Sequence, residues 1–124
     1  MEYRVIKKIK RKILDWLSIH KADRVYAEVV FVSSMNDIPP SIGSKIFIVE
    51  RDDVKRWVVF ECQQHGERIE VNLMKSKRPC WNIEVKRKKV SLWPSIVVEN
   101  EKCDDHFWLR NNKAYLVSNY YGEL

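Results

Sequence analysis

Two short motifs place potential metal ligands at the same spacing. One is Cys62-Gln-Gln-His65 and the other is Cys103-Asp-Asp-His106. A tight turn can direct a Cys and a His three residues apart at one ion, and two such pairs supply the four ligands of a closed tetrahedral zinc site. The alternative is that both cysteines are buried as small hydrophobic residues. The paired spacing favours a structural zinc site.

A second set of residues could carry nucleophilic catalysis. Pro94 breaks an apolar segment because it fixes φ and lacks a backbone donor, so Ser95 is expected at a bend where its hydroxyl can face a cleft. His106 could return beside Ser95 across neighbouring strands and act as its base, with Asp104 or Asp105 orienting the ring. The alternative is a turn serine that bonds to the local backbone.

These two hypotheses compete for His106. A histidine that holds zinc through one nitrogen cannot readily serve as a free general base. If His106 is catalytic, the metal keeps Cys62, His65 and Cys103 as its obvious ligands, or no metal is bound.

Strands are expected to position these side chains. From Arg24 onward, segments rich in β-branched and aromatic residues alternate with turn signals. Asn111-Asn112 predicts a hairpin turn, because Asn tolerates positive φ. The expected strands cover residues 25–32, 45–50, 56–61, 68–74, 80–86, 89–93, 95–99, 107–110 and 113–118.

Residues 1–21 have the pattern of a basic amphipathic helix, which could pack on the domain or bind an anionic membrane surface or an acidic partner. The apolar residues at helical spacing are Val5, Ile6, Ile9, Ile13, Trp16 and Leu17. The predicted class is therefore α+β, mainly β. The helix over 1–21 precedes a single small antiparallel β domain over 22–124, which carries a zinc-ribbon-like pair of knuckles.

Composition and charge limit the classes of function. With 124 residues, 45% hydrophobic residues, three Gly and four Pro, the chain fits one compact domain and is not disordered. Its net charge of +6 is concentrated in residues 1–21 and 75–89, and the remainder is net acidic. Basic residues around Trp81 could bind nucleic acid or an acidic protein. Lysines at hairpin tips also serve solubility and edge protection, so nucleic acid is not the expected partner.

The expected compartment is the cytoplasm. We identify no signal peptide and no apolar run long enough to span a membrane. Three cysteines do not complete a disulfide framework, which indicates reduced thiols. Cys80 has no potential ligand beside it in sequence and is expected in the core.

A series of short motifs resembles a known family. It comprises Trp57-Val-Val-Phe60-x-Cys62, Ile69-x-Val71-Asn72-Leu73, Pro79-x-Trp81, Val90-Ser91-Leu92-x-Pro94-Ser95-Ile96 and Cys103-x-x-His106-Phe107-x-Leu109-Arg110. The series resembles the bacterial family of small proteins catalogued as domain of unknown function six-five-two-seven. The resemblance runs from about Ile38 to Leu116, and its basic Trp-containing N-terminal segment is similar in kind.

The resemblance implies a function. Members are regarded as peptidases that process a bacterial ubiquitin-like protein or remove it from its targets, in operons tied to phage defence. It implies a serine-dependent mechanism carried by Ser95 and His106, with the ubiquitin-like protein or its conjugates as partner. The family's Cys-rich knuckle corresponds to Cys62-Gln-Gln-His65, where His65 stands in for a Cys. The alternative function is a non-catalytic zinc-binding module for protein interaction.

Overall fold

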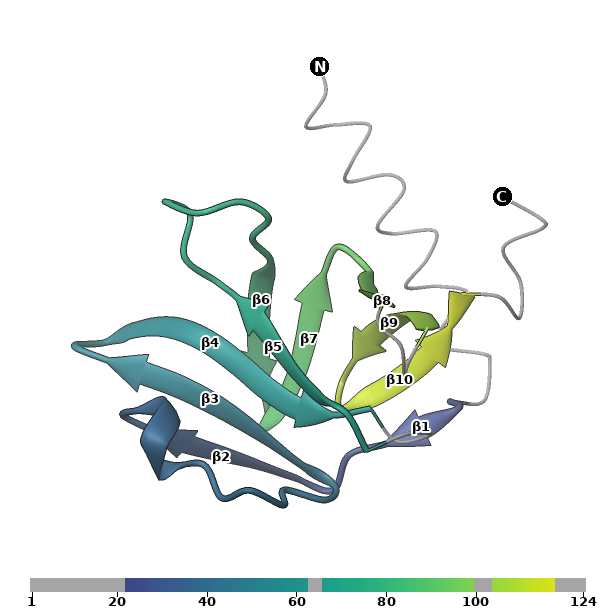
Figure 1. Ribbon diagram of the computed structural model, residues 1–124, viewed down its shortest axis with the longest axis horizontal. Coiled ribbons are helices and arrows are strands. Elements are labelled where there is room, and N and C mark those ends of the chain that lie inside the picture. Colours follow the sequence, from purple (N-terminus) through teal and green to yellow (C-terminus); the bar gives the residue numbers. More distant parts are fainter. Residues whose placement is uncertain (1–21, 63–65, 100–103, 118–124) are drawn as a thin grey trace.

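The structure is a computed structural model that describes residues 22–62, 66–99 and 104–117 (Figure 1). These residues form ten strands and one short 3-10 turn, Met35–Asp37. The strands are β1 (Arg24–Val25), β2 (Glu28–Val32), β3 (Lys45–Arg51), β4 (Val54–Glu61), β5 (Arg68–Asn72), β6 (Asn82–Lys86), β7 (Lys89–Trp93), β8 (Ile96–Glu99), β9 (Asp104–Arg110) and β10 (Lys113–Leu116).

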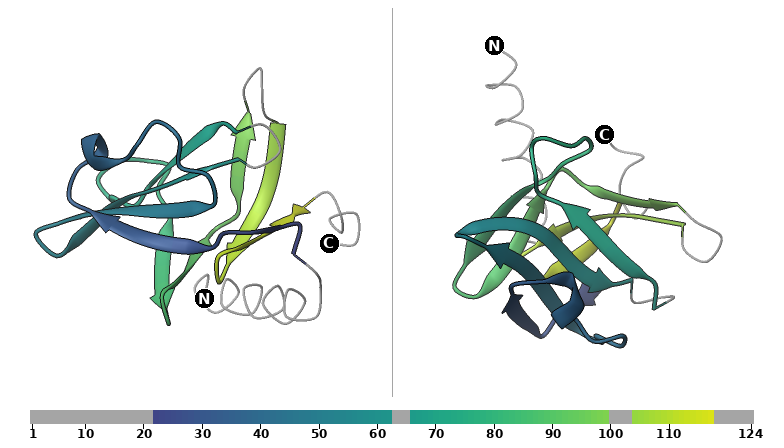
Figure 2. Two further views of the ribbon diagram at one scale, coloured as in Figure 1. Left: turned by 90° about the horizontal axis from the view of Figure 1, so that it is seen from below. Right: turned by 60° about the vertical axis from the view of Figure 1, so that its left-hand side comes forward.

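The strands form three sheets. One has the order β2-β3-β4-β5, the second has the order β1-β10-β9-β8, and β6 and β7 form a two-stranded ribbon. Figures 1 and 2 show the ribbon between the two larger sheets, where it can contribute to a shared core. All pairs are antiparallel except β2 and β3. This parallel pair is joined through residues 33–44, a connection of the length that a crossover needs.

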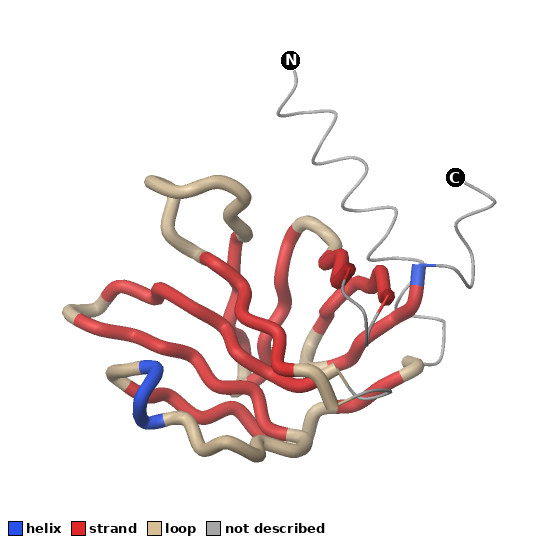
Figure 3. Tube along the Cα trace, viewed as in Figure 1, coloured by secondary structure: helices blue, strands red, loops and turns tan. Residues whose placement is uncertain are grey.

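The predicted α+β class is wrong. Across the three described ranges there is no α-helix, and the 3-10 turn is the main departure from strands and loops (Figure 3). The basic helix predicted over residues 1–21 lies outside the described residues. The domain is mainly antiparallel, as expected, and β2 and β3 are the one pair among the described strands that runs in the same direction. Nor does any described helix have the length and apolar character needed to cross a membrane.

The segment predicted as one strand over 25–32 forms two, in different sheets. Tyr26 donates its backbone N–H to Asn112 at 2.7 Å, and Ala27 donates to Ser44 at 2.8 Å. The chain therefore leaves the β10 side at Tyr26 and enters the β3 side one residue later.

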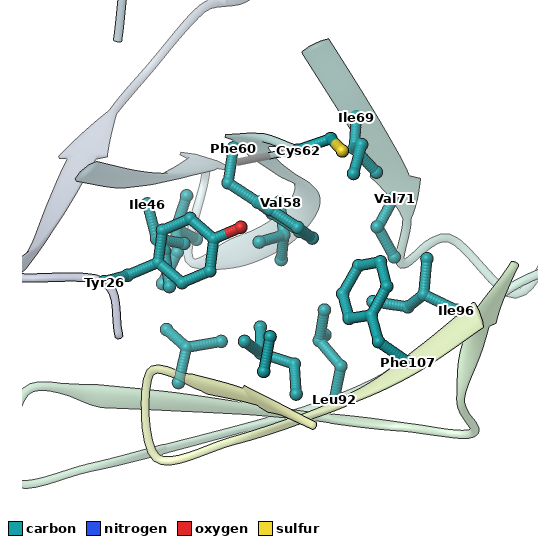
Figure 4. Packing of buried hydrophobic residues seen from close by; sticks show 14 of the residues in the cluster. Tyr26, Ile46, Val58, Phe60, Cys62, Ile69, Val71, Leu92, Ile96 and Phe107 are labelled. Carbon is teal, nitrogen blue, oxygen red and sulfur yellow. The ribbon is translucent and has the colours of Figure 1, made fainter. Parts of the chain in front are cut away.

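The main core lies where the three sheets face one another (Figure 4). Phe60 of β4 has no exposed surface and packs edge-on against Tyr26 at 5.3 Å and Phe107 of β9 at 6.0 Å between ring centroids. β7 contributes Val90 and Leu92. One face each of β4 and β9 is thus committed to this core.

The second face of the β2–β5 sheet is buried as well. Ile38 and Ile42, from the segment that follows the 3-10 turn, pack against Phe47 and Val49 of β3 and Val59 of β4. β3 is buried at four successive positions for this reason. A strand covered on both faces reads as a continuous apolar run.

The turn between β9 and β10 confirms the prediction made from Asn111-Asn112. Both residues have positive φ, 50° and 63°. The Asn112 side chain accepts the backbone N–H of Val90 at 2.7 Å, and the Asn112 backbone N–H donates to the Val90 carbonyl at 2.9 Å. These two bonds tie the start of β7 to the far end of β9.

Candidate active site

Ser95 and His106 are in direct contact. The Ser95 Oγ lies 2.7 Å from the His106 Nε2, and both residues are partly buried. The strand register brings them together, because Val97 of β8 pairs with His106 of β9 and Ser95 precedes β8. Directly opposed residues of an antiparallel pair share a face, and residues two apart along a strand share it too. Ser95, Val97 and His106 are therefore on one face.

Pro94 lies at the break between two strands that positions Ser95. β7 pairs with β6 and ends at Trp93, whereas β8 begins at Ile96 and pairs with β9. Pro94 has no backbone N–H to lose, so a break in hydrogen bonding there costs little. The expected bend is thus present, with Ser95 between two strands that belong to different sheets.

Trp81 holds the backbone of Ser95. The indole Nε1–H of Trp81 donates to the Ser95 carbonyl oxygen at 3.1 Å. The backbone N–H of Trp81 in turn donates to the Asn72 carbonyl at 2.9 Å. This support was not expected from the sequence, although a half-buried Trp seeks a partner for its N–H.

Asn72 organises the loop that leads to Trp81. Its side-chain amide donates to the carbonyl oxygens of Met74, Lys77 and Pro79 at 3.0–3.1 Å, and its Oδ1 accepts the Met74 N–H at 3.0 Å. The side chain is buried. In the sequence, the one signal that could have indicated this role is a polar Asn at the end of an apolar strand segment.

Aromatic residues share the face that carries His106. Trp108 follows His106 by two residues on β9 and stacks on Trp93, with centroids 5.1 Å apart and planes at 24°. Tyr115, paired with Trp108 across β10, and Val117 complete this cluster. Burial raises the pKa of Tyr115 above its ordinary value. The face of β9 that carries His106 thus also carries a packed aromatic cluster, to which Trp93 of the β6–β7 ribbon contributes.

Asp105 is directed to the opposite face of β9. Its Oδ2 lies 3.2 Å from the Sγ of Cys62, which is only 4% exposed at the end of β4. Tyr26 lies beside them and donates its Oη–H to the Glu61 carbonyl at 2.7 Å. Burial, the largest cause, raises the pKa of Tyr26 well above its ordinary value. These side chains line a cavity of about 50 Å³ on the core side.

The structure separates two of the four predicted zinc ligands. Cys62 meets Asp105 on the core face of β9, whereas His106 contacts Ser95 on the other face. His65 and Cys103 lie outside the described residues. Within the residues described, no three His, Cys, Asp or Glu side chains gather as a metal would require. The knuckle expected at Cys103–His106 is instead strand from Asp104 onward.

Other sequence-based expectations have mixed outcomes. Asp105, one candidate to orient His106, contacts Cys62 instead, and the side chain of Asp104 lies outside the description. Cys80 was expected in the core, and this prediction is wrong. It is only partly buried, and its Sγ accepts from Arg78 Nη1 at 3.6 Å.

The basic segment forms two exposed surfaces. Lys75, Lys77 and Arg78 lie in the β5–β6 loop, and residues 86–89 form the tip of the β6–β7 ribbon. The tip turns at Arg87 and Lys88, both of which have positive φ. Within residues 75–89, the basic charge therefore lies on a loop and a hairpin tip, as the sequence predicted.

Comparison with known proteins gives one family. Residues 34–117, about two-thirds of the chain, match the model of the family described as "Bacterial ubiquitination-like system serine protease (BubE)". The match confirms the resemblance drawn from the short motifs and includes both Ser95 and His106. No curated protein and no solved structure matches the chain.

Proposed function

Because the chain belongs to the BubE family of serine proteases of bacterial ubiquitination-like systems, we propose that it cleaves the bond that follows the C-terminus of a ubiquitin-like protein. Ser95 is the nucleophile and His106 is the general base. The observation that carries this assignment is the 2.7 Å contact between Ser95 Oγ and His106 Nε2. This distance is within the reach needed for proton transfer from nucleophile to base.

Every proton transfer in the proposed reaction goes through His106 Nε2. His106 Nε2 takes the hydroxyl proton while Ser95 Oγ bonds to the carbonyl carbon at the end of the ubiquitin-like tail. The resulting tetrahedral intermediate collapses, its C–N bond breaks, and Nε2 returns the proton to the leaving amine. Water then attacks the acyl-enzyme, giving one proton to Nε2, which passes it to Ser95 Oγ. The products are a free carboxylate and an amine.

The same chemistry serves both precursor and conjugate. In a precursor the leaving amine is the α-amino group of the next residue, and in a conjugate it is a lysine side-chain amine. Ser95 attacks the acyl carbon, which both substrates share, and His106 can protonate either leaving amine. We therefore include processing and removal in one activity. The phage-defence operon is what the family resemblance implies, and the cytoplasm is the compartment expected from the cysteine content.

Structural zinc is a second part of the proposal, with Cys62, His65 and Cys103 as ligands. The buried Cys62 thiol beside the Asp105 carboxylate is compatible with zinc, which binds sulfur and oxygen. His106 is left out, because it lies on the opposite face from Cys62. Zinc would clamp chain segments and add to stability. Metal analysis of wild type against Cys62→Ser tests this, and a metal-free wild type contradicts it.

The catalytic proposal is tested by labelling and by cleavage. A fluorophosphonate probe is expected to modify Ser95, located by mass spectrometry, and the protein is expected to cleave a fusion of the ubiquitin-like protein from the same operon. Ser95→Ala should abolish both reactions. His106→Gln should slow them by about 10²–10⁴-fold, as for loss of a general base.

A matched control separates catalysis from general effects. Ser33 is an exposed serine whose Oγ lies 3.4 Å from Asp37, so Ser33→Ala should react like wild type. Cleavage by Ser95→Ala at the wild-type rate refutes the mechanism. Tight binding of the fusion with neither labelling nor cleavage would favour the alternative, a non-catalytic interaction module.

A further inference from the structure

We propose that the free edge of β8 (Ile96–Glu99) is the docking site for the substrate. An extended segment of the ubiquitin-like tail pairs with this edge as an added strand, and its side chain nearest the scissile bond contacts Val97. This inference rests on the proposed function and assigns the way in which the same site binds its substrate. It identifies the partner segment as an extended and locally apolar peptide.

The first observation is the position of β8 in its sheet. Among the described strands, the order β1-β10-β9-β8 leaves β8 at the edge of its sheet, paired with β9 alone. Apart from the pairing with β9, no backbone hydrogen bond joins β8 to a described segment. Along an edge strand, alternate backbone N–H and C=O groups point away from the neighbour and can pair with another chain. β8 therefore presents such groups directly after Ser95.

The second observation is the side chain of Val97. It pairs with His106, lies two residues beyond Ser95, and is 51% exposed. Exposed edge strands are commonly protected by charged residues or proline. Here Pro94 precedes the edge and Glu99 ends it, while Val97 and Val98 between them carry no charge. The uncharged part of the edge is thus the part beside the Ser95–His106 pair.

The two observations fit one mode of recognition. In strand addition, main-chain hydrogen bonds supply affinity and side-chain contacts supply selectivity. An added strand lies about 4.8 Å from its neighbour, so it passes next to the residue that precedes β8. A substrate held along β8 consequently brings one of its backbone carbonyls to Ser95. The apolar contact with Val97 fixes which carbonyl this is.

Val97→Glu tests the inference, because a charge on the edge opposes pairing. Binding of a labelled tail peptide to the full chain carrying Ser95→Ala is measured by fluorescence anisotropy, so that cleavage plays no part. Adding Val97→Glu is expected to weaken binding at least about tenfold, the range of a lost apolar contact with imposed desolvation of a charge. Val54 is exposed to a similar degree, 50%, at the β3–β4 turn, and Val54→Glu should bind like the parent.

A second measurement detects strand pairing itself. Tail peptides with a single backbone N-methyl group at successive positions should lose affinity at every second position, because only alternate N–H groups face β8. Unchanged binding by Val97→Glu, or losses without this period of two, overturns the inference. Fluorophosphonate labelling of Ser95 in the wild-type protein tests the proposed function separately, because that reaction does not require the tail peptide. Failure of docking is thereby distinguished from failure of the proposed function.

Discussion

Replacing Trp81 by phenylalanine is expected to lower kcat strongly and to reduce the free energy of unfolding only modestly. The substitution keeps an aromatic ring but removes the indole N–H that donates to the Ser95 carbonyl at 3.1 Å. The net contribution of such a bond to stability is about 0.5–1.5 kcal/mol. For a chain of this length, that corresponds to a fall in Tm of roughly 2–6 °C.

The effect on rate has a different origin. Ser95 lies between two strands of different sheets, and the Trp81 indole is a bond from a third segment that fixes its carbonyl. A displacement of the nucleophile by about 1 Å can cost about 10²-fold in rate. We therefore expect kcat for the ubiquitin-like fusion to fall about 10–100-fold with little change in KM. Fluorophosphonate labelling should slow in parallel.

Trp57→Phe is the matched control for this prediction. Trp57 is a half-buried residue of β4 that packs against the second face of the β2–β5 sheet, away from Ser95. Trp57→Phe makes the same chemical change at a site remote from Ser95, so it should keep the wild-type kcat. A wild-type kcat in Trp81→Phe, or an equal loss in Trp57→Phe, would refute the positioning role of Trp81.

Three further predictions concern stability and are measured by urea denaturation. Phe60→Ala should cost about 3–5 kcal/mol, because Phe60 is fully buried against Tyr26 and Phe107; a loss below about 1 kcal/mol would contradict this. Asn72→Asp should cost about 2–4 kcal/mol, because a carboxylate cannot donate to the three carbonyl oxygens that the Asn72 amide reaches. Its control, exposed Asn82→Asp, should stay within about 0.5 kcal/mol of wild type. Stability should also fall as pH rises above about 10, since the unfolded chain releases the Tyr26 phenol proton that the folded chain, with its raised pKa, retains. Tyr26→Phe should flatten that alkaline decline, and an equally steep decline in this variant would argue against Tyr26 as its source.

Much of the strand layout could be predicted because the local signals and the tertiary structure agree. The segment 89–93 is predicted and observed with the same bounds, and the Asn111-Asn112 turn has the positive φ that Asn tolerates. The mainly antiparallel pairing was predicted, but the direction of the β2–β3 pair was not. β2 and β3 are parallel, and neither strand carries a residue pattern that distinguishes this from an antiparallel pair. The split at Tyr26 likewise depends on a partner distant in sequence, Asn112.

The candidate site was partly predictable for similar reasons. Pro94 marks a break within a local segment, so the expectation of an available Ser95 hydroxyl needed no tertiary information. The metal hypothesis treated Cys103–His106 as a turn, in which nearby side chains can converge. In a strand, neighbours alternate, and the structure places Asp105 and His106 on opposite faces. The supporting role of Trp81 depends on a contact across the fold and has no local signal.

Side chains along β9 alternate between the core and the face that carries His106, and substitutions on these two faces have different consequences. Phe107 and Leu109 belong to the core, whereas His106 and Trp108 belong to the opposite surface. Substituting His106 should consequently leave a folded protein that can hold its substrate without releasing it, which suits such a variant for capturing conjugates from cells. Deleting one residue within β9 would instead exchange the two sets of side chains. Substitutions within β9 should therefore be tolerated far more readily than insertions or deletions.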